Sequence, residues 1–574
     1  MGTNWIIEGE VDERWPIYTR GNVGEVFPEV VTPFSYFHGV VPAERAWRDT
    51  YTKLGIATPD DFSGDDPVIL GLFAGYTYLN LSYLRMMGVR APGSSAEAID
   101  TTFFGEGDPP PYVPRKGDKS IRSSIKILRT VMKALDQKGL PDAAKDSFGR
   151  AAAQEAARPS LDASDEELFA FMDQFRSEFE GVFGNHMETT ALAAIVSGVL
   201  ADAATAAGEP GLVTHLIGSA GEVHSAQYAN ALYAISRTVA DNDALVAAFD
   251  GGVNGLLHRL RPMPEAEQFL GEFDAFIAEH GQRGPNDWEL SARTWDNTPE
   301  LALAAIDSMR RADHDLSPGQ RLADDAQRRA DAIAKVRPHL GFMDKRNFDK
   351  AIESVGAWSQ GREATRDRAV RFTMPMKQVF RELVRRAAER GGEPDPVKVA
   401  LLDPVDELPA YVADPASMMD VIAERGALFD RYSAIEPPFF VTEQADVPTL
   451  EEMEATKAEA AGAAEVGAVL TGSAGCQGVA RGTARVVLDP ADGSDLEPGE
   501  ILVAPLTDPS WTPLFLPASA VVVNVGALMS HAVIVARELG IPCVVAVDGA
   551  TERIETGMEI EVDGTAGTVT VVAA

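Results

Sequence analysis

The last hundred residues of the chain are patterned as short strands. Residues 501–504, 520–523 and 543–547 are continuous apolar runs, a pattern typical of strands that are buried on both faces. Residues 559–562 and 568–572 alternate apolar and polar positions on either side of a turn, which predicts a closing hairpin. We therefore expect a small β-rich domain at this end of the chain.

One helix is expected inside this β-rich domain, from Ser530 to Leu539. Ser530 is placed to cap the first turn, and Gly540 followed by Pro542 ends the helix. His531 is therefore expected on the first turn.

The central part of the chain, residues 120–440, is patterned as helices. Ser164 and Glu167 have the spacing of a capping box, and apolar positions with a helical period follow them. Another helix is expected over residues 362–388, ahead of a Gly-Gly pair.

The segments on either side of these helices differ in composition. Residues 1–120 are rich in Pro, Gly and aromatic side chains, which predicts loops and short elements. Residues 443–469 are rich in Ala and Glu, which predicts a helical or semi-flexible connector. The chain is therefore predicted to be a multidomain α+β protein with a large, mostly α-helical domain over 1–440, a linker over 441–470 and a β-rich domain over 471–574.

Length and charge narrow the class of protein. A chain of 574 residues is too long for one hydrophobic core, so roughly two to four domains are expected. The net charge is −36, and a chain this acidic is a poor candidate for nucleic-acid binding, which needs Lys and Arg to neutralise phosphates.

No membrane span is expected, and the location is predicted to be cytoplasmic. The longest apolar stretch, residues 191–207, contains polar and glycine interruptions, which favour a buried helix. The N-terminus lacks a basic segment followed by an apolar run, so no secretory signal is visible. Two cysteines, Cys476 and Cys543, cannot form a disulfide framework or a structural zinc site, which favours a reducing compartment.

The placement of His531 favours phosphoryl chemistry. A neutral imidazole is a competent nucleophile at cytosolic pH. The N–H groups at the start of a helix have no partners within the helix and can bind phosphate oxygens. The alternative is that His531 is an ordinary cap or surface residue.

Residues 530–542, Ser-His-Ala-Val-Ile-Val-Ala-Arg-Glu-Leu-Gly-Ile-Pro, resemble the phosphohistidine signature of the phosphoenolpyruvate-utilising (PEP-utilising) enzymes. Residues 478–486 and 507–513 are similar to segments of the same domain. The resemblance implies a C-terminal swivelling β/β/α phosphohistidine domain in which His531 carries the phosphoryl group. The chain departs from the family pattern at Ala527, where Gly is usual, and at Cys476, where Ser is common.

The mostly α-helical part resembles the substrate domain of rifampin phosphotransferase and its relatives. The resemblance rests on residues 20–25, Arg-Gly-Asn-Val-Gly-Glu, and on residues 281–285, Gly-Gln-Arg-Gly-Pro, where Gln282 replaces the usual His. It implies a substrate-binding domain over 1–440 that presents a hydroxyl group of a small organic molecule.

Family enzymes take the phosphoryl group from ATP on an ATP-grasp domain. No Gly-rich phosphate loop of the Walker type occurs in this chain. The resemblance therefore implies a donor site on a separate ATP-grasp partner that binds ATP and Mg, with no cofactor and no metal site in this chain. The alternatives are a non-catalytic binding scaffold that keeps the fold, and a separate phosphoenolpyruvate-binding donor.

The remaining site residues are predicted from this resemblance and from the chemistry of their side chains. Arginines can bind a phosphate through two hydrogen bonds, although each of these could instead form a structural salt bridge. Asn and Glu can orient a substrate hydroxyl, although both types also occur in turns. The predicted substrate- or phosphate-binding residues are Arg20, Asn22, Glu25, Arg283, Arg362, Arg366 and Ser530.

Overall fold

The computed structural model describes residues 8–62, 64, 67–91, 94–104, 109–217, 224–311, 318–460, 462–490, 496–507, 511–526 and 530–573.

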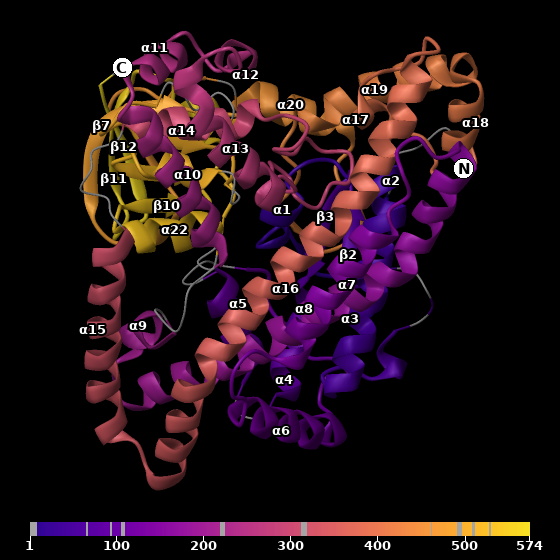
Figure 1. The fold of residues 1–574 in the computed structure, drawn as a ribbon. Coiled ribbons are helices and arrows are strands. Elements are labelled where there is room, and N and C mark those ends of the chain that lie inside the picture. The colour runs from indigo at the N-terminus through magenta and orange to yellow at the C-terminus, as the bar shows by residue number, and fades with distance from the viewer. Residues whose placement is uncertain are drawn as a thin grey trace.

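Two long helices form the backbone of the mostly α-helical part. Helix α8 (Asp165–Ala206) packs along α16 (Phe342–Ala388), which crosses the molecule diagonally in Figure 1. α3 (Val41–Leu54) and α7 (Asp142–Ala157) pack against this pair. The helix predicted over 362–388 is thus the second half of a longer one, because buried apolar residues continue back to Phe348.

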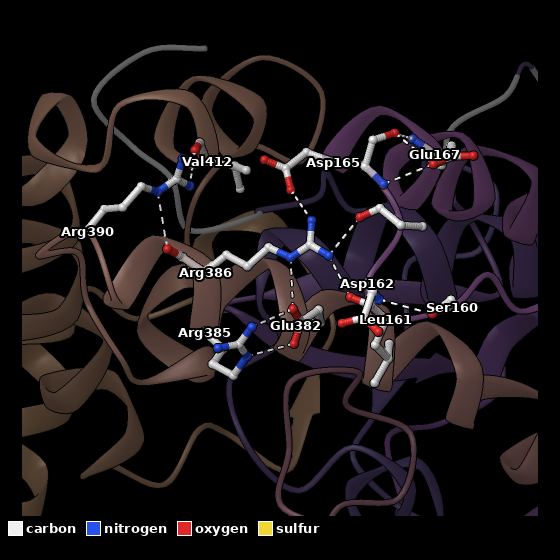
Figure 2. A network of polar contacts seen from close by, with 12 residues as sticks. Ser160, Leu161, Asp162, Asp165, Glu167, Glu382, Arg385, Arg386, Arg390 and Val412 are labelled. Carbon is white, nitrogen blue, oxygen red and sulfur yellow. Dashed lines mark hydrogen bonds and ion pairs between the residues drawn. The ribbon is translucent and has the colours of Figure 1, made fainter.

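The predicted capping box at the start of α8 is confirmed. Ser164 Oγ accepts a hydrogen bond from the Glu167 amide, and the Glu167 carboxylate accepts one from the Ser164 amide at 2.9 Å. Figure 2 shows how this end of α8 is tied to α16: Arg386 donates to Asp165 at 2.6 Å and to Glu382 at 2.8 Å. These contacts hold the two longest helices in register.

Helix α8 is also the one helix, within the described ranges, with the length and hydropathy to cross a membrane. Its apolar residues instead face other helices, and Phe175, Val182, Val196 and Leu200 are fully buried. The buried helix predicted for residues 191–207 is therefore confirmed.

The N-terminal region is more ordered than predicted. It contains α3, α4 (Leu81–Arg90) and a four-stranded sheet in the order β2-β3-β1-β4. The strands are β1 (Tyr18–Thr19), β2 (Leu70–Phe73), β3 (Tyr76–Asn80) and β4 (Phe440–Val441). The prediction of loops and short elements is confirmed for the strands, which are two to five residues long. It missed helices α3 and α4 and the four-stranded sheet, because β4 joins that sheet from far along the chain.

A second helical unit has its own core. Its helices are α10 (His224–Ala240), α11 (Asp243–Asp250), α12 (Leu256–Leu260), α13 (Glu267–His280) and α14 (Glu300–Arg311). They enclose an apolar cluster that includes Leu232, Phe249, Phe273 and Leu303. These helices lie beside the yellow C-terminal domain in Figure 1, and α14 contacts its short helix α21 (Thr512–Phe515).

The C-terminal domain is built on an eight-stranded sheet in the order β5-β12-β11-β7-β8-β9-β10-β6. The strands are β5 (Val469–Thr471), β6 (Ser473–Cys476), β7 (Val479–Val486), β8 (Ile501–Ala504), β9 (Ala520–Val523), β10 (Cys543–Val545), β11 (Glu559–Asp563) and β12 (Thr568–Ala573). The predicted apolar strands and the closing hairpin are confirmed. β7, β8, β9 and β10 run parallel, and alternate residues of the apolar strands enter separate clusters on the two faces.

Helix α22 (His531–Leu539) covers one face of this sheet. Two short helices, α21 and α23 (Ala550–Arg553), accompany it, although one helix was predicted. The remaining helices are α1 (Val23–Val26), α2 (Pro33–Ser35), α5 (Ala96–Phe104), α6 (Ile121–Leu135), α9 (Val213–Ile217), α15 (Pro318–Val336), α17 (Pro396–Val399), α18 (Glu407–Ala413), α19 (Met419–Ser433) and α20 (Leu450–Ala460).

The predicted linker contains helix α20. Arg431 of α19 donates to Glu454 of α20 at 2.9 Å, and Leu450 and Met453 pack into a small cluster with Ile435. This part of the connector is therefore held against the helical part.

Candidate active site

His531 occupies the first position of α22. Ser530 precedes it in an extended conformation, and its Oγ accepts a hydrogen bond from the Val533 amide at 3.3 Å. Gly540 ends the helix in the left-handed conformation at φ 69°. The predicted cap and the predicted end of the helix are both confirmed.

Two threonine hydroxyls contact the imidazole ring of His531. Thr507 Oγ1 lies 3.2 Å from Nδ1, and Thr512 Oγ1 lies 3.1 Å from Nε2. The edge of the ring meets Phe515 at a centroid distance of 5.8 Å. Because a hydroxyl can donate or accept, these partners allow the neutral ring to keep an N–H on one nitrogen and a lone pair on the other.

The surroundings of His531 keep the ring neutral. Burial, followed by the cation of Arg366, lowers the pKa of His531 to about 3. Both effects disfavour the protonated ring. At neutral pH the side chain is therefore an uncharged nucleophile beside a fixed positive charge.

Arg366 reaches the site from helix α16 of the mostly α-helical part. Within the described part of the chain, no hydrogen bond or ion pair engages its guanidinium. A partly exposed arginine without a carboxylate partner is suited to receive a phosphate through two parallel hydrogen bonds. Of the predicted arginines, Arg366 is the one whose charge acts on His531.

Tyr228 of α10 lies between the mostly α-helical part and the C-terminal domain, near Arg283, Arg366 and Thr512. Its buried ring lies 5.6 Å from the guanidinium of Arg283. Burial raises the pKa of Tyr228, while Arg283, Arg366 and the side chain of Thr512 oppose that rise. Tyr228 therefore lies among residues of both domains.

Arg283 is buried and is paired with two carboxylates. It forms ion pairs of 2.8 Å with Asp287 and with Asp367, the residue that follows Arg366. Burial opposes its charge, but Asp287 and Asp367 together raise the pKa of Arg283. The observed contacts of Arg283 tie the loop after α13 to α16, and Gln282 in that loop is also buried.

Arg362 lies one turn before Arg366 on α16. Its side chain is 43% exposed and lies 3.8 Å from the carboxylate of Glu363. Burial, then Arg362 and Arg366, lowers the pKa of His186 to about 3. His186 Nδ1 lies 3.2 Å from Thr365 Oγ1, so this histidine belongs to the core beneath the two arginines.

The three predicted site residues near the N-terminus are Arg20, Asn22 and Glu25, and no contact of theirs with His531 is seen among the described residues. Arg20 is buried and donates to the backbone carbonyls of Phe27, Pro28 and Thr77 at 2.8–3.1 Å. Asn22 is exposed and has a positive φ of 70°. The side chain of Glu25 lies outside the described residues.

Among the described residues, no group of three or more His, Cys, Asp or Glu side chains is arranged to hold a metal ion.

Three functional candidates escaped the sequence reasoning. Thr507 and Thr512 lie in a segment that resembles the family, but nothing in its pattern shows that they contact His531. Tyr228 lies nearly three hundred residues earlier, on a helix with no motif. Their proximity arises only when the helical unit and the C-terminal domain come together.

Comparisons with known proteins agree with this architecture. Residues 496–567 match the family model of the PEP-utilising enzyme mobile domain, and residues 185–363 match that of the rifampicin phosphotransferase fourth domain. Similar proteins include the prodigiosin synthesizing transferase PigC of Serratia marcescens, 27% identical over 98% of this chain and 64% of the relative. An uncharacterized protein of Mycobacterium tuberculosis strain H37Rv is 33% identical over 54% of this chain and 32% of its own length.

A rifampicin phosphotransferase of Streptomyces sviceus is 27% identical over 57% of this chain and 37% of its own length. The chain thus spans between 32% and 64% of the length of these three relatives.

Proposed function

Because the chain belongs to the PEP-utilising enzyme family, we propose that it is a phosphotransferase component that carries a phosphoryl group on His531. From His531 the group passes to a hydroxyl of a small organic molecule. The observation that supports this proposal most strongly is the neutral imidazole of His531, placed at a helix N-terminus and beside Arg366.

The first transfer forms a P–N bond. The lone pair of a neutral His531 nitrogen attacks the phosphorus of the donor, and the bond from phosphorus to the donor's leaving oxygen breaks. Phosphoryl transfer needs in-line positioning and charge neutralisation more than covalent machinery. The amide groups at the start of α22 are suited to receive the phosphoryl oxygens.

The second transfer forms a P–O bond. The acceptor hydroxyl attacks the phosphorus and releases its proton to solvent, the P–N bond breaks with its electron pair returning to the ring nitrogen, and His531 returns to its neutral form. Arg366 supplies positive charge where negative charge develops during the transfer, because it faces His531 from the mostly α-helical domain. In this arrangement the histidine faces the domain to which we assign the acceptor.

The donor is proposed to be ATP held with Mg on a separate ATP-grasp protein. Family resemblance supports an ATP-grasp donor site, and its location on a separate protein is part of the proposal. The relative that aligns with 98% of this chain is named as a transferase that synthesizes prodigiosin, which fits an acceptor that is a small organic molecule.

Labelling with ATP carrying a radioactive β-phosphate tests the donor. The chain, a candidate ATP-grasp protein and ATP are mixed, and acid-labile, base-stable label on the chain is measured. We expect label only when both proteins are present, and loss of that label when the correct hydroxyl compound is added. Label obtained from phosphoenolpyruvate and its binding protein would reassign the donor. No label from either donor would favour a non-catalytic scaffold.

A further inference from the structure

The two cysteines of the chain face each other across one pair of strands. Cys476 ends β6 and Cys543 begins β10, and the two residues are direct partners in the antiparallel register. Opposed residues in such a pair have Cα atoms roughly 4.5–5.5 Å apart. Disulfides join Cα atoms roughly 4.4–6.8 Å apart, so the register places this pair within disulfide range.

Both cysteine side chains lie on the same face of the sheet. Each contributes to the apolar cluster that α22 covers, and Cys476 Sγ lies 3.7 Å from the Ala536 carbonyl oxygen of that helix. The register shifts beside Cys543, so that Gly475 and Cys476 together oppose it. A Cβ atom at Gly475 would lie 3.3 Å from Cys543 Sγ, which shows how closely the bulged strand approaches this thiol.

We propose that Cys476 and Cys543 form an intramolecular disulfide when the protein meets a peroxide. Both residues carry thiols in this structure. The thiolate of Cys476, the more exposed of the two, attacks one oxygen of hydrogen peroxide, and the O–O bond breaks. The hydroxide that leaves takes up a proton from solvent, so the products are a sulfenic acid and water. The Cys543 sulfur then displaces the hydroxyl as a second water, and the S–S bond forms.

The strand pair is connected to the helix that carries His531. Arg537 of α22 donates from Nε to the Gly475 carbonyl oxygen at 3.0 Å. Formation of the disulfide turns Cys476 Sγ toward Cys543 and away from Ala536. Oxidation is therefore expected to loosen the second half of α22. The disulfide itself is independent of the proposed function.

Burial raises the pKa of the Cys476 thiol, with Arg537 as the opposing cation. A smaller thiolate fraction slows the attack on peroxide. We therefore expect the disulfide to form slowly, in response to oxidant, and not to be a permanent structural bond. Transient disulfides of this kind are the usual ones in reducing compartments.

Peptide mapping under non-reducing conditions tests the proposal. The full chain is treated with hydrogen peroxide, quenched with a thiol-blocking reagent, digested and analysed by mass spectrometry. We expect a cross-linked peptide pair containing Cys476 and Cys543, which disappears after reduction. Absence of this pair from folded protein whose thiols have been consumed would overturn the proposal.

Two variants make the test specific for register. Cys476→Ser should lose the cross-link completely. The double variant Cys476→Ser with Ala474→Cys restores a thiol on β6 at a position that is partnered with Val544 rather than with Cys543, so it should form no cross-link. Equal cross-linking in this double variant would contradict the argument from register. Hydrogen exchange of α22 amides should be faster in the oxidised chain, and unchanged exchange would contradict the coupling to α22.

Discussion

At the scale of single residues, the imidazole of His531 combines three properties that a phosphoryl carrier needs. It is neutral because burial and Arg366 disfavour its protonated form. Thr507 and Thr512 contact its two ring nitrogens and limit the rotation of the ring. A phosphoryl group on either nitrogen would place negative charge near the Arg366 cation.

Replacing Arg366 by Gln should raise the pKa of His531, because the substitution removes a nearby positive charge while burial remains. It should also slow phosphorylation of His531 on the order of 10²-fold. NMR titration of the ring proton and initial labelling rates measure the two effects. Arg362→Gln, one turn away on the same helix, is the matched control and should leave the pKa of His531 unchanged.

Buried histidines are expected to make the protein sensitive to acid. Burial lowers the pKa of His38 to about 3, with Arg176 adding to the effect, and neither ring nitrogen of His38 has a partner among the described atoms. The unfolded chain binds this proton near pH 6.5, so stability is retained above that pH and is lost as pH falls toward 3. Between pH 7 and pH 5 this histidine should lower the free energy of unfolding by about 2 kcal/mol.

Urea unfolding of the His38→Leu variant measures this contribution. The difference in unfolding free energy between pH 7 and pH 5 should shrink by about 2 kcal/mol relative to the original chain. An unchanged difference would mean that His38 binds its proton equally well in the folded and unfolded states.

The sequence was most informative where the site is continuous. His531, its cap Ser530 and the end of the helix at Gly540 lie in one short segment, so local rules placed the helix and the resemblance of that segment to the family pointed to His531. Arg366 was predicted only as one of four arginines, and nothing local distinguished it from Arg283. The structure separates these two by their partners, because Asp287 and Asp367 neutralise Arg283.

At the scale of elements, α22 positions His531, the proposed nucleophile, through its first turn. Ser530→Ala removes the cap that the Val533 amide uses, and should lower the free energy of unfolding by about 1 kcal/mol. Ser530→Asp retains a capping oxygen and should unfold like the original chain. Its negative charge beside His531 should nevertheless slow phosphorylation by electrostatic repulsion.

Thermal or urea unfolding and the labelling rate together separate these two roles. If Ser530→Asp labels as fast as the original chain, the start of α22 does not bind the phosphoryl oxygens.

Elements with strong local signals were predictable, and elements defined by distant partners were not. The capping box at Ser164 begins α8, and the apolar runs at 501–504 and 520–523 are β8 and β9. Strands β1 and β4 are two residues long and pair across more than four hundred positions. Such strands carry no periodic pattern that could reveal them.

At the scale of the whole molecule, the C-terminal domain is docked against the second helical unit. α14 contacts α21, and Leu516 packs against the apolar cluster of that unit. Arg293 also forms an ion pair of 2.5 Å with Asp489, which joins the two parts. Both side chains of this pair are partly exposed to solvent, so the pair contributes little to the free energy of docking. The apolar contact is therefore expected to dominate docking.

Leu516→Asp should loosen this docking, because it places a charge against an apolar surface. Small-angle X-ray scattering should show a larger radius of gyration than that of the original chain. Leu488→Asp alters a leucine of the same domain that is 66% exposed, so it should leave the radius unchanged. Equal expansion in both variants would show that Leu516 does not hold the domains together.

The most direct measurement of the central claim is mass-spectrometric mapping of phosphohistidine under non-acidic conditions, which preserve the P–N bond. The chain is incubated with ATP and its ATP-grasp partner, beside a His531→Ala control. We predict a phosphoryl group on His531 that is absent from the control. With an active partner present, an unmodified His531, or a phosphoryl group on another residue, would contradict the account.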